Sequence, residues 1–513
     1  MTKLRKVLIL SGIIALLGLG ASTFAQTTTV LKGTVTDQNG AVVPNAKVTL
    51  SSASKSVSQT AQTTGDGGFS FRGLEPGDDY IVTIEAQGFG KVVLSNVKTQ
   101  VGSDTDLSPS LKPGSVGVSI DVTAGGAELL NTTDSNISQG FNSRQAVDLA
   151  ATSIGSGINN LALLAANVTT SGGVGVGTGG SVGGERARDN NFVVDGIDNN
   201  DKSVTGPQAY ISPEEVQEFT LISNQTPAEY ARSNGGQFIT VTKSGGKDYH
   251  GTFYGFIQNR NLNAGASDRY DRFRGGFNFG GPVPAVFSQM QHGDDPHWGQ
   301  KSDKLFFFGS YERLQNGLGA AALPIFAPTA NGRTILAGIA GLSNNNRNVF
   351  LQYMPVAPTN NGGNVIVNGV AVPVGLASIT APNFFKQNHA IGNIDFNQSS
   401  KTIHRWRFSM TNLAEIDAAA NLPQFFIALP LKQRLFSYTI IHNFSSTFID
   451  EMRFGFRRSS NNFPAGNLQY PGLSMFPNIQ VDELGVNIGP DPNAPQFTIE
   501  NNYQIVDNFT WIH

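Results

Sequence analysis

The sequence predicts a mostly β chain in which an Ig-like β-sandwich and a mixed α+β unit precede the first part of a transmembrane antiparallel β-barrel. Two observations lead to this prediction. Short β-prone runs are separated by turns rich in Gly, Pro, Asn and Asp in the N-terminal part of the chain. From about residue 248 onward, long segments alternate between aromatic residues and polar residues or glycine, as barrel strands do.

The composition excludes several classes of function. The 513 residues carry a formal net charge of -3, and no block of Lys or Arg follows residue 6, so no nucleic-acid partner is expected. Cysteine is absent, which excludes disulfides, thiolate zinc sites and a cysteine nucleophile. Neither a zincin, a G-x-S-x-G nor a Walker A pattern occurs, so we predict neither an enzyme nor a bound cofactor.

Residues 1–25 have the layout of a secretory signal. Lys3, Arg5 and Lys6 precede an apolar run over 7–20, and small residues follow, which predicts cleavage after Ala25. A membrane anchor is the alternative, but the run is shorter than the ~20 apolar residues that a spanning helix needs. Because no later segment is apolar enough for such a helix, any further membrane part has to be a barrel.

Residues 27–112 read as the β-sandwich, because several short strands follow one another at nearly regular spacing. The run over 80–85 shows the expected alternation. Tyr80, Val82 and Ile84 should share one face of their strand, and the intervening residues the other.

Residues 113–247 read as the α+β unit, with helix-like pieces near 143–150 and 158–168 and strands further on. In the second helix-like piece, an apolar stripe is predicted for Ile158, Leu161, Leu164 and Ala165.

Residues 248–513 read as barrel strands. In the stretch 451–458, Met452, Phe454 and Phe456 should point one way, and Arg453, Gly455 and Arg457 the other. A soluble sandwich also alternates, but here one face repeatedly carries arginine or glycine and the other aromatics. This favours a membrane barrel, with the first face toward a watery lumen and the second toward lipid. Very short connections and one very long connection, about 316–384, also favour a membrane barrel.

Three aspartates follow a short apolar run in "NNFVVDGIDNND", residues 190–201. Calcium is one interpretation of Asp195, Asp198 and Asp201, but their spacing does not match the D-x-[DN]-x-[DN]-G loop. A strand that ends at Val194 and a turn at Asp195-Gly196 explain the cluster without a metal, and no metal site is predicted. The G-x-G-x-x-G match at 175–180 lacks the helix that a dinucleotide site needs, so a flexible glycine-rich loop is favoured.

Two resemblances to known families follow from longer motifs. "GTVTDQNGAVVPNAKVTL" and "TTGDGGFSFRGLEPGDDYIVTIEAQGFG" resemble the carboxypeptidase-regulatory-like domain, which has the carbohydrate-binding-like fold. "RARDNNFVVDGIDNND", "SPEEVQEFTLISNQTPAEYARSNGGQFITVTKSGGKDYHGTFYGFIQNRNLNA", "FRGGFNFGGPV" and "KSDKLFFFGSYE" resemble TonB-dependent outer-membrane receptors of the Oar-like group.

The second resemblance implies a barrel plugged by the preceding unit. Large plugged transporters have ~22 strands, and the residues after 247 supply roughly half of them at ~10 residues per strand plus loops. The chain also stops inside a plausible strand, 502–513, so we expect the sequence to be part of a longer protein. The expected division is a signal over 1–25, a sandwich over 27–112, a plug over 113–247 and a partial barrel over 248–513.

The resemblance also implies partners. "VSIDVTA" is similar to the TonB box, through which such receptors bind the TonB energy-transducing complex of the inner membrane, and an ordinary linker strand is the alternative. The segment comprises Val118, Ser119, Ile120, Asp121, Val122, Thr123 and Ala124. Candidate ligand contacts in the plug are Arg186, Arg188, Asp195, Asp198 and Asp201.

Three functions remain open at this point. The first is TonB-dependent uptake of an unidentified small-molecule, glycan or peptide cargo across the outer membrane, with outer-membrane lipid around the barrel. The second is an outer-membrane structural or adhesion protein that uses its loops and its carbohydrate-binding-like sandwich for surface contacts. The third is a secreted carbohydrate-binding protein without a barrel.

Overall fold

The computed structural model describes residues 27–511 with internal gaps, and the predicted signal over 1–25 with its cleavage site lies outside the described residues. The gaps are 53, 56, 115–118, 124–135, 150–156, 171–179, 203–205, 227–229, 231–232, 263–269, 285–300, 320–322, 380–381, 418–419 and 446–447. In the described ranges, no helix is both long and apolar enough to cross a membrane.

The N-terminal unit is a β-sandwich of a three-stranded and a five-stranded sheet. The first sheet has the order β5 (Gly68–Leu74), β1 (Thr29–Thr34), β8 (Asp104–Leu107). The second has the order β10 (Ser119–Thr123), β7 (Lys91–Thr99), β6 (Gly77–Glu85), β3 (Lys47–Ser52), β4 (Val57–Gln62). The short strands β2 (Thr36–Asp37) and β9 (Ser110–Leu111) pair beside them. Tyr80, Val82 and Ile84 are fully buried between the sheets, which confirms the predicted alternation of β6.

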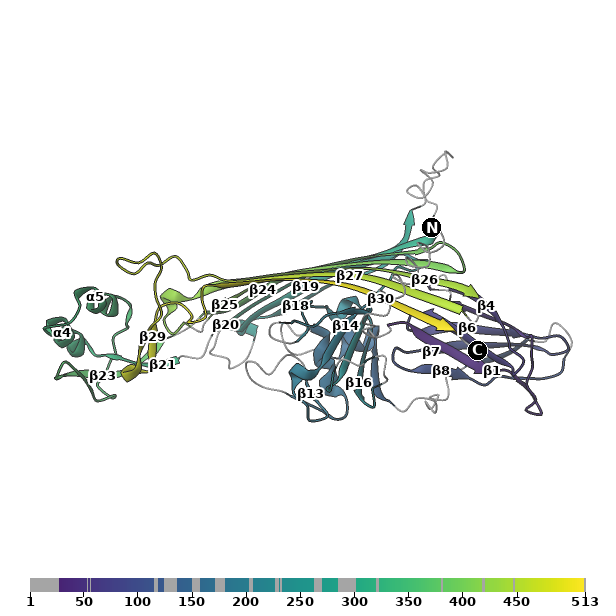
Figure 1. Ribbon diagram of the computed structural model, residues 1–513, viewed down its shortest axis with the longest axis horizontal. Helices are drawn as coiled ribbons and strands as arrows, with labels where there is room; N and C mark the ends of the chain where they lie inside the picture. Colours follow the sequence, from purple (N-terminus) through teal and green to yellow (C-terminus); the bar gives the residue numbers. More distant parts are fainter. Residues whose placement is uncertain are drawn as a thin grey trace, which may run out of the picture.

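The α+β unit, which we call the plug after its predicted role, is built on a five-stranded sheet that lies below the concave face of the barrel sheet in Figure 1. Its order is β11 (Ile137–Asn142), β16 (Val216–Asn224), β17 (Gln237–Thr242), β14 (Asn191–Val194), β15 (Ile197–Asp198). The remaining elements are α2 (Ser143–Asp148), η1 (Gly157–Leu164), β12 (Val168–Thr170), β13 (Gly180–Val182), η2 (Ala187–Asp189) and η3 (Pro213–Glu215).

The predicted apolar stripe of the plug is wrong at Leu164. Ile158, Leu161 and Ala165 are buried, but Leu164 is 55% exposed. The segment is a 3-10 helix rather than an α-helix, and Leu164 is its last residue. The different period and the position at the helix end turn this side chain away from the core.

Eight long antiparallel strands form the curved barrel sheet of Figure 1. Their order is β18 (His250–Gln258), β19 (Tyr270–Pro284), β20 (Lys301–Gly319), β24 (Pro382–Asn397), β25 (Thr402–Asp417), β26 (Ile427–Ser445), β27 (Phe448–Phe463), β30 (Gln496–Trp511). Each strand pairs with its sequence neighbour in this order, and β18 and β30 are the two outer strands. Among the described residues β18 and β30 do not pair with each other, so the sheet is open there, in agreement with the predicted partial barrel.

The two faces of the barrel sheet have the polarity expected of a membrane barrel. Met452 is 45% exposed, whereas its neighbours Glu451 and Arg453 are buried at 4% and 1%. On β25, Phe408 is 43% exposed between buried Arg407 and Ser409. A soluble sandwich would bury the aromatic face instead, so the exposed apolar face and the buried polar face agree with the alternation predicted for a membrane barrel.

The far end of the barrel sheet carries a folded unit made from its connecting loops, which we call the outer-loop module. It contains β21 (Leu323–Pro328), α4 (Ala330–Gly338), α5 (Asn344–Tyr353), β22 (Asn364–Val367), β23 (Val370–Ile379), η6 (Pro423–Phe425), β28 (Ile479–Val481), η7 (Asp482–Leu484) and β29 (Val486–Ile488). A common apolar core joins the segments around Val374, Phe425 and Phe476. The described residues of the long connection predicted near 316–384 are therefore folded, and β20 and β24 extend into it.

Candidate functional site: polar seams between sandwich, plug and barrel wall

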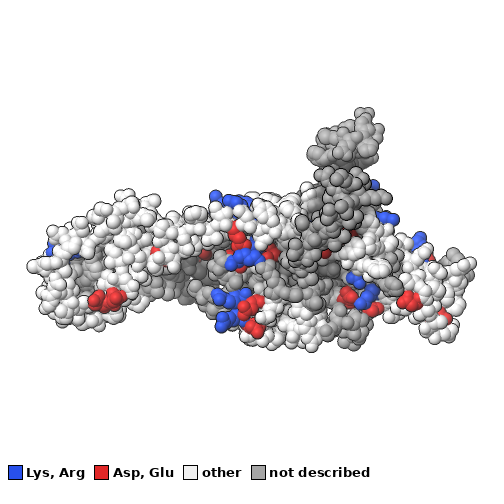
Figure 2. Space-filling model, viewed as in Figure 1, with Lys and Arg blue, Asp and Glu red and all other residues white. Residues whose placement is uncertain are grey.

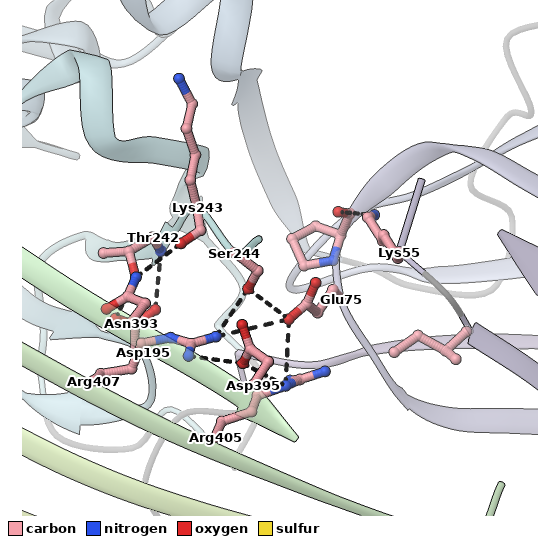
Figure 3. Close-up of polar contacts among 12 residues, drawn as sticks. Lys55, Glu75, Asp195, Thr242, Lys243, Ser244, Asn393, Asp395, Arg405 and Arg407 are labelled. Carbon is pink, nitrogen blue, oxygen red and sulfur yellow. Dashed lines mark hydrogen bonds and ion pairs between the residues drawn. The ribbon is translucent and has the colours of Figure 1, made fainter. Parts of the chain in front are cut away.

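Charged side chains gather on the middle of the face that Figure 2 shows, and others are largely buried where the sandwich, the plug and the barrel sheet meet. Three parts of the chain meet there. The sandwich contributes the turn after β5, the plug contributes the exit from β17, and the barrel sheet contributes the inward faces of β24 and β25. We call this meeting point the basal seam (Figure 3).

Glu75 of the sandwich is the acidic centre of the basal seam. Its Oε1 lies 3.3 Å from Nε of Arg405 and 3.8 Å from Nη2 of Arg407. Ser244 Oγ, just after β17, donates to the same carboxylate oxygen at 3.0 Å. Burial opposes the ionisation of Glu75, but Arg405, Lys55 and Arg407 outweigh it and hold the pKa of Glu75 below its ordinary value.

Arg407 connects all three parts. Its Nη1 lies 2.8 Å from Oδ1 of Asp395 on the neighbouring strand, and its Nη2 donates to Ser244 Oγ at 2.9 Å. Because Arg407 is 6% exposed, loss of either carboxylate would leave a buried guanidinium with too few partners. The sandwich therefore helps to hold the chain exit from the plug against the wall.

The turn of the quoted aspartate cluster lies beside the basal seam. Val194 ends β14, and Asp195 accepts hydrogen bonds from the amide and the hydroxyl of Thr242 at 2.9 and 2.8 Å. Asn393 of the wall donates to Thr242 Oγ1 and to the carbonyl of Lys243. Asp195 thus fixes the end of β17 where that strand contacts the barrel sheet.

Gly196 allows the same turn to approach the wall closely. It has φ +78°, and a Cβ placed there would lie 2.1 Å from the guanidinium of Arg453. The adjoining Ile197 packs against Gly455 of the same wall strand. Two glycines and one arginine therefore form a close contact that no larger residue could make.

A second polar seam lies around the short helix η3 of the plug. Glu215 accepts from the Ser212 amide at 3.1 Å and lies 2.8 Å from Nε2 of His389 on the wall. Glu312 of the wall accepts from the Tyr210 and Ser212 hydroxyls, each at 2.7 Å, and from Arg274 at 2.9 Å. Both carboxylates are almost completely buried, so their partners are essential to the seam.

The sandwich also contacts the plug directly, through the turn between β7 and β8. The amide of Val101 donates to Oε1 of Glu218 at 2.8 Å, and Thr220 Oγ1 donates to the same oxygen. Gly102, with φ +75°, lies against Ile222. Burial raises the pKa of Glu218 to about 7, against the opposite effect of the two hydrogen bonds.

The other sequence-predicted site residues are distributed over the plug. Asp198 is buried, and its carboxylate binds Lys202 at 2.7 Å; burial opposes its ionisation, but Lys202 and Asn200 outweigh it and lower its pKa to about 2. Its backbone contacts the wall, since its amide donates to Gln504 and its carbonyl accepts from Arg457. Asp201 is half-buried, and the side chains of Arg186 and Arg188 are exposed.

These positions do not form a metal site among the described residues, where no group of three or more His, Asp or Glu side chains could hold a metal ion. Asp195 and Asp198 instead have partners within the protein.

The segment similar to a TonB box is partly described. Ser119–Thr123 form β10, whose backbone pairs in parallel with Lys91–Ser95 of β7 at the edge of the sandwich. Val118 and Ala124 lie outside the described residues.

Sequence reasoning missed the residues that make the seams. Glu75, His389 and the neighbours Glu215 and Glu218 come from three separate parts of the chain, and none stands in a recognisable catalytic pattern. One local signal was present at Ser212, because Ser212-x-x-Glu215 is the capping-box pattern and both of its hydrogen bonds form.

Two parts of the chain match known protein families. Residues 241–513, over half of the chain, match the family described as "Outer membrane beta barrel domain". The chain belongs to this outer-membrane β-barrel family. Membership places the protein in the outer membrane. Residues 30–112 match the "Carboxypeptidase regulatory-like domain", which confirms the first resemblance.

A curated relative is similar over about half of the chain. The TonB-dependent transporter Oar of Myxococcus xanthus is 28% identical over 259 residues, covering 49% of this chain and 24% of Oar. This match confirms the resemblance to the Oar-like group. The relative is a transporter and not an enzyme, in agreement with the sequence prediction. The chain thus spans about a quarter of the length of this relative.

The solved structures that the chain resembles include an outer-membrane transporter and a siderophore receptor. The transporter YddB from Escherichia coli has a TM-score of 0.46 and 12% identity, covering 73% of this chain and 45% of that one. The siderophore receptor PirA from Acinetobacter baumannii has a TM-score of 0.43 and 11% identity, covering 72% of this chain and 44% of that one.

Proposed function

We propose that this outer-membrane β-barrel protein serves TonB-dependent uptake, in which the plug is displaced to let cargo pass. The observation that carries the proposal is the polar character of the seams between plug and wall. Glu215 and Glu312 are buried and Glu75 is 14% exposed, and each binds partners from another part of the chain. The name of the relative Oar, a TonB-dependent transporter, supports the same function.

A polar seam suits a plug that must move and return. When it opens, the exposed carboxylates, guanidinium groups and hydroxyls are solvated by water, which offsets part of the lost attraction. An apolar seam would instead expose surface at a cost of about 25 cal/mol per Å². The buried ion pairs also fix one register for closing, because each charge has a specific partner.

The segment 118–124 is proposed to bind the TonB complex. In its described part, β10 is an edge strand of the sandwich, so its backbone already pairs as an added strand. Such a strand can exchange to a sheet edge on another protein with the same kind of hydrogen bonds. Pulling β10 away would load β7, whose following turn holds Val101 against Glu218 of the plug.

Deletion of 118–124 tests this proposal. We expect it to abolish energised uptake while leaving the amount and heat-modifiability of the folded barrel unchanged. Val122→Pro should give the same loss, since proline removes a strand donor. Val122→Ala should retain uptake. Unchanged uptake after the deletion would remove this role from the segment.

The proposal extends to the domain boundaries, the signal cleavage site and the candidate cargo contacts. We propose the division into signal, sandwich, plug and barrel at 1–25, 27–112, 113–247 and 248–513, with cleavage after Ala25. N-terminal sequencing of the exported protein should then begin at Gln26. Arg186 and Arg188 are the candidate cargo contacts whose side chains are exposed.

A surface-adhesion role is the second candidate, and the outer-loop module favours it. The module has its own apolar core around Val374 and Phe476, which exceeds what a simple loop needs. Uptake assays in a TonB-deficient strain separate the two functions. Adhesion should persist there, whereas energised uptake should be lost.

A further inference from the structure

The outer-loop module contains a cavity with a volume of about 710 Å³. It lies between α5, the strand β22 and the β28–β29 hairpin, at the end of the molecule opposite the sandwich (Figure 1). Long loops of outer-membrane barrels face the outside of the cell, which places the cavity there. Its size lies within the ~300–1,000 Å³ that is usual for ligand sites.

One wall of the cavity is an open strand edge. β22 is the outer strand of the sheet β21-β23-β22, and Val365, Ile366 and Val367 all line the cavity. Since neighbouring side chains point to opposite faces, a run of three consecutive lining residues means that the edge itself faces the cavity. The strand carries neither a charge nor a proline, the usual protections of a free edge.

The hydrogen-bonding direction of this edge follows from the hairpin. Asn368 and Gly369 form a two-residue turn with φ +47° and +79°, so Val367 and Val370 are the closing hydrogen-bonded pair. By alternation, the amides and carbonyls of Ile366 and Asn364 point away from β23. Pro373, which has no N–H, lies opposite Asn364, as this register requires.

The opposite wall presents side chains rather than an edge. Ile479 and Val481 of β28 line the cavity, whereas Gln480 between them does not and is exposed. Apolar side chains at every second residue fit an extended ligand that turns alternate side chains toward this wall.

The charge at the rim is acidic. Arg347 lines the cavity, but its Nη2 donates to Asn344 at 2.8 Å and its Nη1 donates to the carbonyl of Ile339. Glu483 also lines the cavity, and both it and the adjacent Asp482 are exposed. Figure 2 shows an acidic patch on the otherwise mostly uncharged face of this end of the molecule. A cationic group on the ligand would complement this rim.

We propose that the cavity binds an extended peptide segment with alternating apolar side chains and a basic residue at the Glu483 rim. The peptide adds to β22 as a strand, pairs with Ile366 and Asn364, and rests its apolar side chains on Ile479 and Val481. The proposal deepens the proposed function by naming a cargo class, and only the peptide's role as cargo rests on that function.

Fluorescence anisotropy with the full-length receptor in detergent tests the site directly. The probe is the peptide Lys-Val-Ser-Val-Ser-Val with a C-terminal fluorophore. Ile366→Lys should weaken binding about tenfold or more, because it places a charge at the pairing edge. Val370→Lys is the matched control: Val370 lies on the same hairpin, is 39% exposed and does not line the cavity. It should bind like the wild type.

A modified probe and a variant of the cavity rim distinguish a peptide site from a general apolar pocket. N-methylation of alternate amides in the probe should abolish binding, since it removes the pairing donors. Glu483→Lys should weaken binding of the lysine probe. A second probe, in which glutamate replaces the lysine, should bind this variant as the first probe binds the wild type. Equal binding of the N-methylated probe, equal loss in Val370→Lys, or no saturable binding would each overturn the proposal.

Failure of the site and failure of the transport function give different results. Deletion of 118–124 should leave peptide binding unchanged whatever its effect on uptake. Peptide binding without TonB-dependent uptake would contradict the proposed function alone. Uptake that continues unchanged in Ile366→Lys, together with absent peptide binding in the wild type, would contradict the peptide site alone.

Discussion

Glu218 makes the docking of the sandwich on the plug depend on pH. In the docked state the carboxyl is buried and accepts from the amide of Val101, with a pKa of about 7 against an ordinary value of 4.5. Undocking exposes the carboxyl to water and returns its pKa toward that ordinary value. The undocked state therefore releases the proton at lower pH than the docked state does.

The sign and size of the effect follow from this difference. Below pH 4.5 the group is protonated in both states and does not oppose docking. As pH rises through the interval up to about 7, ionisation increasingly favours undocking, and the loss is complete above that value. At about 1.4 kcal/mol for each unit of pKa, the loss amounts to about 3 kcal/mol, or a few hundred-fold in the docking equilibrium.

Glu218→Gln isolates this effect, because the amide oxygen can still accept from Val101 but does not titrate. We expect the variant to dock more tightly than the wild type at pH 8 and almost equally at pH 4, where the carboxyl is protonated in both states. Hydrogen exchange of the Val101 amide, compared between the two proteins at the same pH, measures the difference. Exchange of the buried core strand β6 serves as the control for global unfolding.

The reasoning would be refuted by either of two results. The first is an equal Val101 exchange rate in wild type and variant at pH 8. The second is a Glu218→Gln protein that keeps the full pH dependence of the wild type, since another group would then control docking.

Three further predictions concern the wall and its contact with the plug. Arg407→Ala should destabilise the assembled protein by about 3–5 kcal/mol, because it removes the closest cation from buried Asp395 and one of the two arginines beside Glu75, and thermal unfolding in detergent would measure this. Gly196→Val should lower the melting temperature by several degrees through the clash with Arg453 and the positive φ, whereas Gly392→Ala, where a Cβ meets nothing within 4 Å, should not. Phe408→Arg should reduce membrane assembly by about 2–4 kcal/mol at mid-membrane depth, with Phe408→Leu as the neutral control; normal folding of the arginine variant into lipid vesicles would show that this face does not contact lipid.

Much of the fold could be predicted because strand alternation is a local property. Whether Met452 and Arg453 face opposite ways depends only on their being neighbours in one strand, and the structure agrees. The turn at Asp195-Gly196 could likewise be predicted from the sequence, since Asp followed by Gly favours a positive φ. The exposure of Leu164 at the end of η1 could not be predicted, because helix type depends on packing around the segment.

The site was predicted less completely. The aspartates of the quoted cluster were singled out as candidate ligand contacts, and the structure gives Asp195 and Asp198 partners within the protein. Glu218 gave no signal in the sequence, since an ordinary strand glutamate acquires its raised pKa only by burial under another unit.

The sequence by itself determined the strands, their two faces, the order of sandwich, plug and barrel, and the family. These follow from periodicity and from motifs that are continuous along the chain. Only the tertiary structure decided which charges meet, as between Glu75 and Arg407, and that the outer loops fold around one cavity. Such contacts join residues that are far apart in sequence, so the closure of the fold places them together and no local pattern records them.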